Sequence, residues 1–138
     1  MTVPHIQPIN PSTLPPPVGF AHGYEVRSGR VVFMAGQVAR DREGRVIAPG
    51  DLVGQFRQVC ENLRAVVEAA GGQLTHVVKL TIYVLDAAEY KRQARAIGGV
   101  YREYFGKHFP AMTLVGARDL YDAPDGCVLE IEGVAAIP

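Results

Sequence analysis

Two carboxylates near the C-terminus form the clearest acid–base pattern in the chain. We expect a strand from Cys127 to Ala135, in which side chains alternate between the two faces of a sheet. Glu130 and Glu132 therefore share one face, and Ile131 points to the other. A well-placed carboxylate can act as a general base, and the alternative for each glutamate is a structural role. Glu132 is the more structural candidate, and we expect it to pair with Lys79 on an adjacent strand.

Histidine and cysteine are the other residue types that could do chemistry. His22 lies in a glycine-containing loop, and a histidine there is either an acid–base group or an exposed loop residue. Cys60 and Cys127 have no CxxC spacing, which excludes the usual zinc and redox motifs. Their apolar neighbours predict two small buried residues. The remaining histidines show no partner pattern and are expected at the surface: His5, His76 and His108.

Length and composition favour one soluble domain over residues 1–138. The chain is 48% apolar and 20% charged, enough to bury a core. Its net charge is zero, which disfavours nucleic acid as a partner and fits burial of surface in an oligomer. No apolar run approaches the roughly 20 residues that span a bilayer, and the N-terminus lacks a signal-peptide pattern. We therefore expect a cytoplasmic protein without membrane contact.

An extended arm precedes the regular elements. Residues 1–18 contain six of the ten prolines, and proline fixes φ and lacks an amide donor. Strands are predicted from β-branched runs and turn residues, and helices from apolar residues at three- and four-residue spacing. The predicted elements are a β-hairpin of 24–26 with 31–35, a helix over 51–70, a strand over 77–85, a helix over 87–105, and strands over 111–115 and 127–135.

Capping residues support the two helices. Asp51 and Asp86 each precede a helical pattern and are suitable N-caps. The pair Gly98–Gly99 lies inside the second helix and costs about 1 kcal/mol per glycine relative to alanine, so we expect a kink there. The element order predicts an α+β fold, a mixed β-sheet with two helices packed on one face. The other face must be buried, most simply by a second copy of the chain.

From Gly19 to Ile137 the chain resembles the RidA/YjgF family of imine deaminases. No single motif carries the resemblance; the order and spacing of many short ones do. They are Gly29, 31–37, Gln55, 61–63, 68–71, 77–84, Asp86, Tyr101, 104–106, 110–111 and 130–132.

The resemblance implies a chorismate-mutase-like fold and a homotrimer, in which the sheets line a central barrel and a cleft forms at each interface. It implies hydrolysis of reactive enamines and imines to a keto acid and ammonia, without a metal or organic cofactor. Glu130 would be catalytic, orienting and deprotonating the attacking water. The residues implied to bind substrate are Phe20, His22, Gly36 (through its backbone), Met112, Thr113 and Leu114.

The chain departs from the family pattern at several of these positions. Met112 stands where most members have an arginine that grips the substrate carboxylate through charge-assisted hydrogen bonds. His22 stands where a tyrosine is common in the family. Gly98 stands where an asparagine is often found, and Thr113 stands in place of a serine. Met112 either lines an apolar substrate pocket or fills an inactive cleft. Arg118 follows six residues later and is either structural or a replacement anion site.

Three functional hypotheses follow. The first is a RidA-like hydrolase acting on C=N bonds, whose specificity is altered because the carboxylate-binding arginine is lost. The second is a non-catalytic trimer that binds a small metabolite or a protein partner in the interface cleft. The third is a ribonuclease, a function once assigned to relatives, which the zero net charge and the absence of an aromatic and basic surface pattern disfavour.

Overall fold

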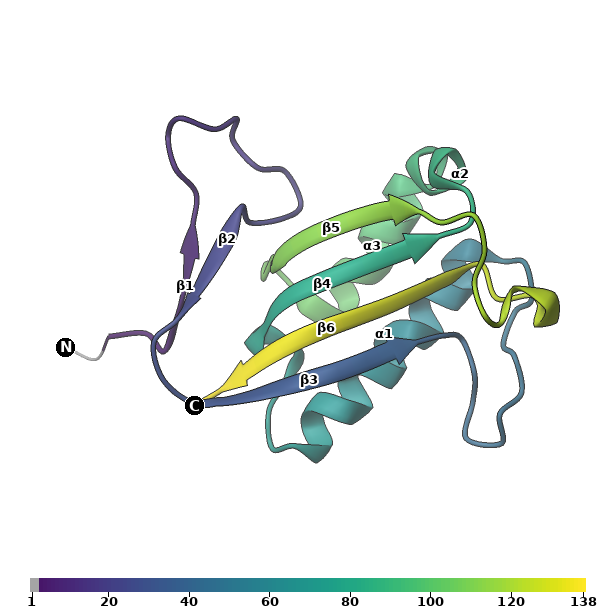
Figure 1. Ribbon diagram of the computed structural model, residues 1–138, viewed down its shortest axis with the longest axis horizontal. Helices are drawn as coiled ribbons and strands as arrows, with labels where there is room; N and C mark the ends of the chain where they lie inside the picture. Colours follow the sequence, from purple (N-terminus) through teal and green to yellow (C-terminus); the bar gives the residue numbers. More distant parts are fainter. Residues whose placement is uncertain (1–2) are drawn as a thin grey trace.

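A four-stranded mixed sheet forms the front layer of the molecule, in the order β3-β6-β4-β5 (Figure 1). The computed structural model describes residues 3–138. Strand β6 is antiparallel to both β3 and β4, and the edge strand β5 is parallel to β4. The four strands are β3 (Arg30–Gln37), β4 (Val77–Val84), β5 (Ala111–Gly116) and β6 (Leu129–Ile137). The last strand therefore begins and ends two residues later than predicted.

Three helices cover one face of this sheet (Figure 1): α1 (Leu52–Ala69), α2 (Ala87–Arg92) and α3 (Ala94–Phe105). Both predicted caps are confirmed. Asp51 accepts a hydrogen bond from the amide of Gly54 at 3.1 Å, and Asp86 accepts one from the amide of Glu89 at 3.0 Å. The α+β class with helices on one face of a mixed sheet is also confirmed. No helix in the described residues is both long and apolar enough to cross a bilayer.

The second helical segment is interrupted at Gln93, and it is unbroken at Gly98–Gly99, where a kink was expected. Gln93 lies between α2 and α3 with φ −99° and ψ 13°. Helix α3 runs through both glycines because its apolar face is held by the core. That face comprises Ile97, Val100, Tyr101 and Phe105, all buried. Tertiary packing of four large side chains outweighs the helix propensity of two glycines.

The predicted hairpin between residues 24–26 and 31–35 is also wrong. Strand β2 (Gly23–Val26) pairs with β1 (Ile6–Ile9) in a separate two-stranded sheet, while β3 pairs with β6. Gly29, at φ +108°, turns the chain between the two sheets. Within the proline-rich arm, Ile6–Ile9 is a strand, and a turn follows in which the amide of Leu14 donates to the carbonyl of Pro11 at 3.1 Å. Pro8 is tolerated in that strand because a two-stranded sheet has only edge strands.

Buried polar groups hold the loops against the core. Gln55 is fully buried; its side chain donates to the carbonyls of Ala48 and Gly126 and accepts from the amide of Val128. Cys60 and Cys127 are buried, as predicted. The prediction of unpartnered surface histidines is wrong for all three. His5 and His108 each bond through Nε2 to a strand carbonyl, at 2.8 and 2.6 Å, and Nδ1 of His76 accepts a hydrogen bond from the amide of Gln73 at 3.1 Å. All three are half-buried.

The sheet face away from the helices carries uncovered apolar side chains. Phe33 is 80% exposed, Val31 50% and Val115 41%. Phe33 and Val31 lie on β3 and Val115 on β5, the two edge strands of the sheet. Between them, the open face of β4 and β6 carries polar side chains, including Lys79, Glu130 and Glu132. Large apolar side chains this exposed are a feature that a cover over this face would explain.

Candidate functional site

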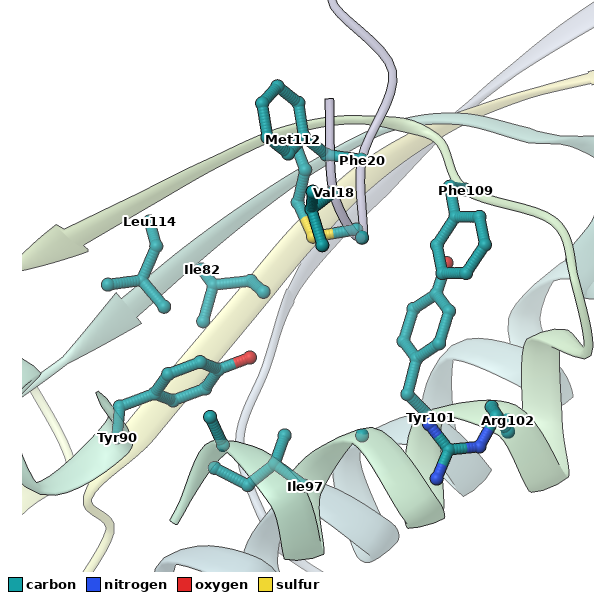
Figure 2. A pocket seen from close by; sticks show the side chains of 13 residues that line it. Val18, Phe20, Ile82, Tyr90, Ile97, Tyr101, Arg102, Phe109, Met112 and Leu114 are labelled. Atoms are coloured by element: carbon teal, nitrogen blue, oxygen red, sulfur yellow. The ribbon is translucent and has the colours of Figure 1, made fainter. Parts of the chain in front are cut away.

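A cavity of about 670 Å³ lies between β5, the helices α2 and α3, and the loop that precedes β2 (Figure 2). Met112 and Leu114 enter it from β5, Phe20 from the loop, and Ile97 from α3. Cavities of about 300–1,000 Å³ enclose ligands of drug size, which are larger than a three- or four-carbon acid. The lining is mostly apolar and includes no aspartate, glutamate or histidine.

Two tyrosines and one arginine are the polar side chains of the cavity. Figure 2 shows the Tyr90 hydroxyl directed into the space, and burial raises the pKa of this phenol to about 12. Tyr101 stacks on Phe109 and donates its hydroxyl proton to the carbonyl of His108 at 2.5 Å. Burial raises its pKa as well. Both tyrosines stay neutral near pH 7. Arg102 is therefore the only charged side chain among the lining residues.

Strand alternation places the site residues from the resemblance on two faces of the sheet. Met112 and Leu114 point toward the helices and line the cavity, whereas Thr113 points to the open face. Glu130 also stands on the open face, opposite Tyr83 in register. Within one chain, the cavity set (Phe20, Met112, Leu114) is therefore separated from the open-face set (Gly36, Thr113, Glu130) by the sheet itself.

Gly36 and Glu130 are in close contact on the open face. A Cβ atom added to Gly36 would overlap the Glu130 carboxylate, whose carbon Cδ lies 2.9 Å from that position. Partial burial raises the pKa of Glu130, and the negative charges of Asp122 and Glu132 raise it further. A raised pKa keeps a carboxylate a stronger base, suited to taking a proton from water.

The expected ion pair between Lys79 and Glu132 is not formed. Lys79 donates to Oγ1 of Thr113 at 2.9 Å, and Glu132 accepts a hydrogen bond from the Tyr83 hydroxyl at 2.9 Å. The strand register explains the difference, because Glu132 lies opposite Thr81 while Lys79 lies opposite Val134. The hydrogen bond to Glu132 raises the pKa of Tyr83. The shared face of Glu130 and Glu132 agrees with the buried position of Ile131 between them.

His22 fastens the loop that carries Phe20. Its Nε2 donates to the carbonyl of Pro15 at 2.8 Å, its amide donates to Asn10 at 2.9 Å, and its ring stands edge-on to Phe20. It is absent from the cavity lining, as is Arg118, which is exposed. The loop contributes Phe20 itself to the cavity.

Sequence inspection did not single out the cavity residues on the helices. Tyr90, Ile97, Tyr101 and Arg102 all line the space. The spacing of residues 94, 97, 98, 101 and 102 follows one face of a helix, a pattern that indicates a shared surface but not what that surface contacts. For metals, no cluster of three or more His, Cys, Asp or Glu side chains suited to an ion occurs in residues 3–138.

Comparison with known proteins covers nearly the whole chain. The family model described as endoribonuclease L-PSP matches residues 13–137. A RutC family protein of Pyrococcus horikoshii is 36% identical over 88% of this chain and 90% of its own length. A 2-iminobutanoate/2-iminopropanoate deaminase of Dermatophagoides farinae is 30% identical over 89% of this chain and 90% of its own length. The crystal structure of a conserved Rid family protein from Yersinia pestis superposes with a TM-score of 0.81 at 33% identity, covering 96% of this chain and 99% of that one.

Proposed function

Because the chain belongs to the RidA family, which includes 2-iminobutanoate/2-iminopropanoate deaminases, we propose that it hydrolyses reactive imines or enamines with an altered specificity. The reaction adds water to the C=N carbon and releases ammonia, leaving a carbonyl compound. The observation that carries the proposed specificity is the apolar cavity beside Met112. It suits a substrate recognised by its apolar body rather than by a carboxylate next to the C=N carbon.

The proposal includes a homotrimer, because one chain does not assemble the site. Gly36, Thr113 and Glu130 are on the open face of the sheet, and the cavity is on the opposite face. Packing the open faces of three copies around an axis would bury Phe33, which is 80% exposed in one chain. It would also bring Glu130 of one protomer to the edge strand β5 of its neighbour. Burial of this apolar surface supports association.

In this arrangement Glu130 is the general base. Its carboxylate takes one proton from water as the water attacks the C=N carbon and passes it to the nitrogen, which gives a carbinolamine. It then takes the second proton from the new hydroxyl group and gives it to the nitrogen as the C–N bond breaks, so that the carbonyl forms and ammonia leaves. The raised pKa of Glu130 supports this role. Gly36 contributes its backbone carbonyl, which can accept a hydrogen bond from the attacking water. Thr113, bonded to Lys79, supplies a hydroxyl near the edge of β5.

A mutation at Gly36 tests the closeness of this pair. Gly36→Ala should lower turnover by at least about tenfold, because the added Cβ would push the Glu130 carboxylate away from its position. The melting temperature should change little, since the displaced atoms belong to a flexible side chain. Gly99→Ala is the matched control, because a Cβ there meets no atom within 4 Å. Equal turnover in the two variants would exclude a positioning role for Gly36.

The wild-type protein should discriminate imines by the size of their apolar part. We expect it to accelerate decay of the imine derived from leucine at least about tenfold more than that of 2-iminopropanoate. The apolar cavity contacts the larger side chain, and Met112 offers no charge to the carboxylate. An amino-acid oxidase generates both imines, and a coupled assay follows the released ammonia. Faster hydrolysis of 2-iminopropanoate would contradict the proposed specificity.

The alternative is a non-catalytic trimer that binds a metabolite or a protein partner. It is favoured by the cavity lining, which in one chain contains no carboxylate or histidine. Sedimentation of a trimer that binds apolar ligands but leaves every imine unchanged would support this alternative. A nucleic-acid substrate is disfavoured by the zero net charge, because backbone phosphates require compensating cations.

A further inference from the structure

Arg102 is a cation at the wall of an otherwise nearly uncharged cavity. It lies on α3, and its side chain is exposed at the rim (Figure 2). No acidic residue lines the cavity with it. An arginine guanidinium presents several N–H donors in a plane and matches the two oxygens of a carboxylate.

The guanidinium of Arg102 is free to receive a ligand. Within residues 3–138, its side chain forms no hydrogen bond or ion pair, whereas most other arginines on the helices are paired. Arg57 binds Glu103 at 2.6 Å, Arg64 binds Glu61 at 2.7 Å, and Arg92 binds Glu89 at 2.5 Å. The donors of Arg102 therefore face solvent and the cavity.

Gly98 makes room for this side chain. The two residues are four apart on α3 and share one face of the helix. A Cβ atom added to Gly98 would lie 3.5 Å from Nη1 of Arg102, so the guanidinium folds back over the glycine. Gly98 itself lines the cavity. Because residue 98 has no side chain, the guanidinium of Arg102 can lie over the helix surface at the cavity, beside the space that a ligand would occupy.

Arg102 and Met112 face the cavity from opposite walls (Figure 2). The side chain of Met112 extends from β5 and that of Arg102 from α3. The stacked rings of Tyr101 and Phe109 line one side of the cavity between them. An anionic group at Arg102 would therefore be separated from a reacting carbon near β5 by a length of apolar wall. A ligand that fills this cavity of about 670 Å³ is larger than a three-carbon imino acid.

We propose that Arg102 binds the carboxylate of the substrate, and that this carboxylate is separated from the C=N carbon by an apolar chain or ring. The substrate class is then an extended apolar imine or enamine with a terminal carboxylate. The inference rests on the proposed function for the identity of the C=N group, but the binding of an apolar carboxylate at Arg102 does not require turnover. Arg102 is a specificity-determining residue in this account.

Calorimetric titration with a matched pair of unreactive probes tests the inference. The probes are 4-phenylbutanoate and its neutral analogue 4-phenylbutanamide. The wild-type protein should bind the carboxylate about tenfold more tightly than the amide, because only the carboxylate forms charge-assisted hydrogen bonds. Arg102→Gln should reduce this ratio to about one and leave binding of the amide unchanged. Arg102→Lys, which keeps the charge, should retain part of the preference.

Arg95→Gln is the control, since Arg95 is an exposed arginine on the same helix that does not line the cavity. It should keep the wild-type ratio. An unchanged ratio in Arg102→Gln, or a wild-type protein that binds neither probe, would overturn the inference. Because these titrations contain no imine, a protein that shows the Arg102-dependent preference but hydrolyses no imine would refute the proposed function alone.

Discussion

Replacing Glu130 with glutamine should reduce imine hydrolysis by at least about 100-fold and leave the protein folded. Glutamine has the same shape but cannot take a proton from water, and general-base catalysis typically contributes about 10²- to 10⁴-fold. Glu130 lies on the open sheet face and is only partly buried, so the uncharged amide should be accommodated. Ammonia release gives the rate, and circular dichroism with sedimentation checks the fold and assembly.

Glu132→Gln is the matched control for this prediction. Glu132 is two residues along the same strand and on the same face, but it is engaged by the Tyr83 hydroxyl. Its loss should change the maximal rate by less than about threefold. A turnover in Glu130→Gln equal to that in Glu132→Gln would remove Glu130 from the mechanism.

The pH profile gives a further check on the same residue. A general base works when ionised, so the rate should fall as pH decreases through the pKa of Glu130. Burial raises that pKa, and Asp122 and Glu132 add to it, so the midpoint should lie above the usual range of a glutamate. Glu132→Gln removes one of these negative charges, and the midpoint should move to lower pH. A midpoint that does not respond to Glu132→Gln would assign the titration to another group.

Met112→Arg should raise kcat/KM for 2-iminopropanoate by about 10- to 100-fold. The new guanidinium would bind the carboxylate next to the C=N carbon, and a hydrogen bond to a charged group contributes about 1.5–3 kcal/mol. Met112 is only partly buried, and the cavity of about 670 Å³ leaves space for the longer side chain. The coupled ammonia assay measures the change against wild type.

Two variants separate charge from position in this experiment. Met112→Leu alters the side chain without adding charge and should leave the low activity on 2-iminopropanoate unchanged. Leu114→Arg adds the same charge two residues along β5, on the same cavity wall, and should give a smaller gain. An inert Met112→Arg variant, in a protein that hydrolyses larger imines, would show that Met112 does not set the specificity.

Local sequence patterns determined the helices and the faces of the strands. Asp51 and Asp86 were identified as caps because an N-cap depends only on a side chain and the amide three residues later. The common face of Glu130 and Glu132 follows from alternation within one strand. The joint spacing of many short motifs identified the family, which the comparisons confirm.

Tertiary structure alone decided how these elements meet. Strand β2 pairs with β1 rather than with β3. Glu132 accepts a hydrogen bond from Tyr83 instead of pairing with Lys79, and this depends on the register between strands about 50 residues apart in sequence. Helix α3 continues through Gly98–Gly99 because its buried side chains contact distant segments. For the same reason the placement of Arg102 beside the cavity could not be predicted: a helix face is visible in sequence, but the surface packed against it is set by long-range contacts.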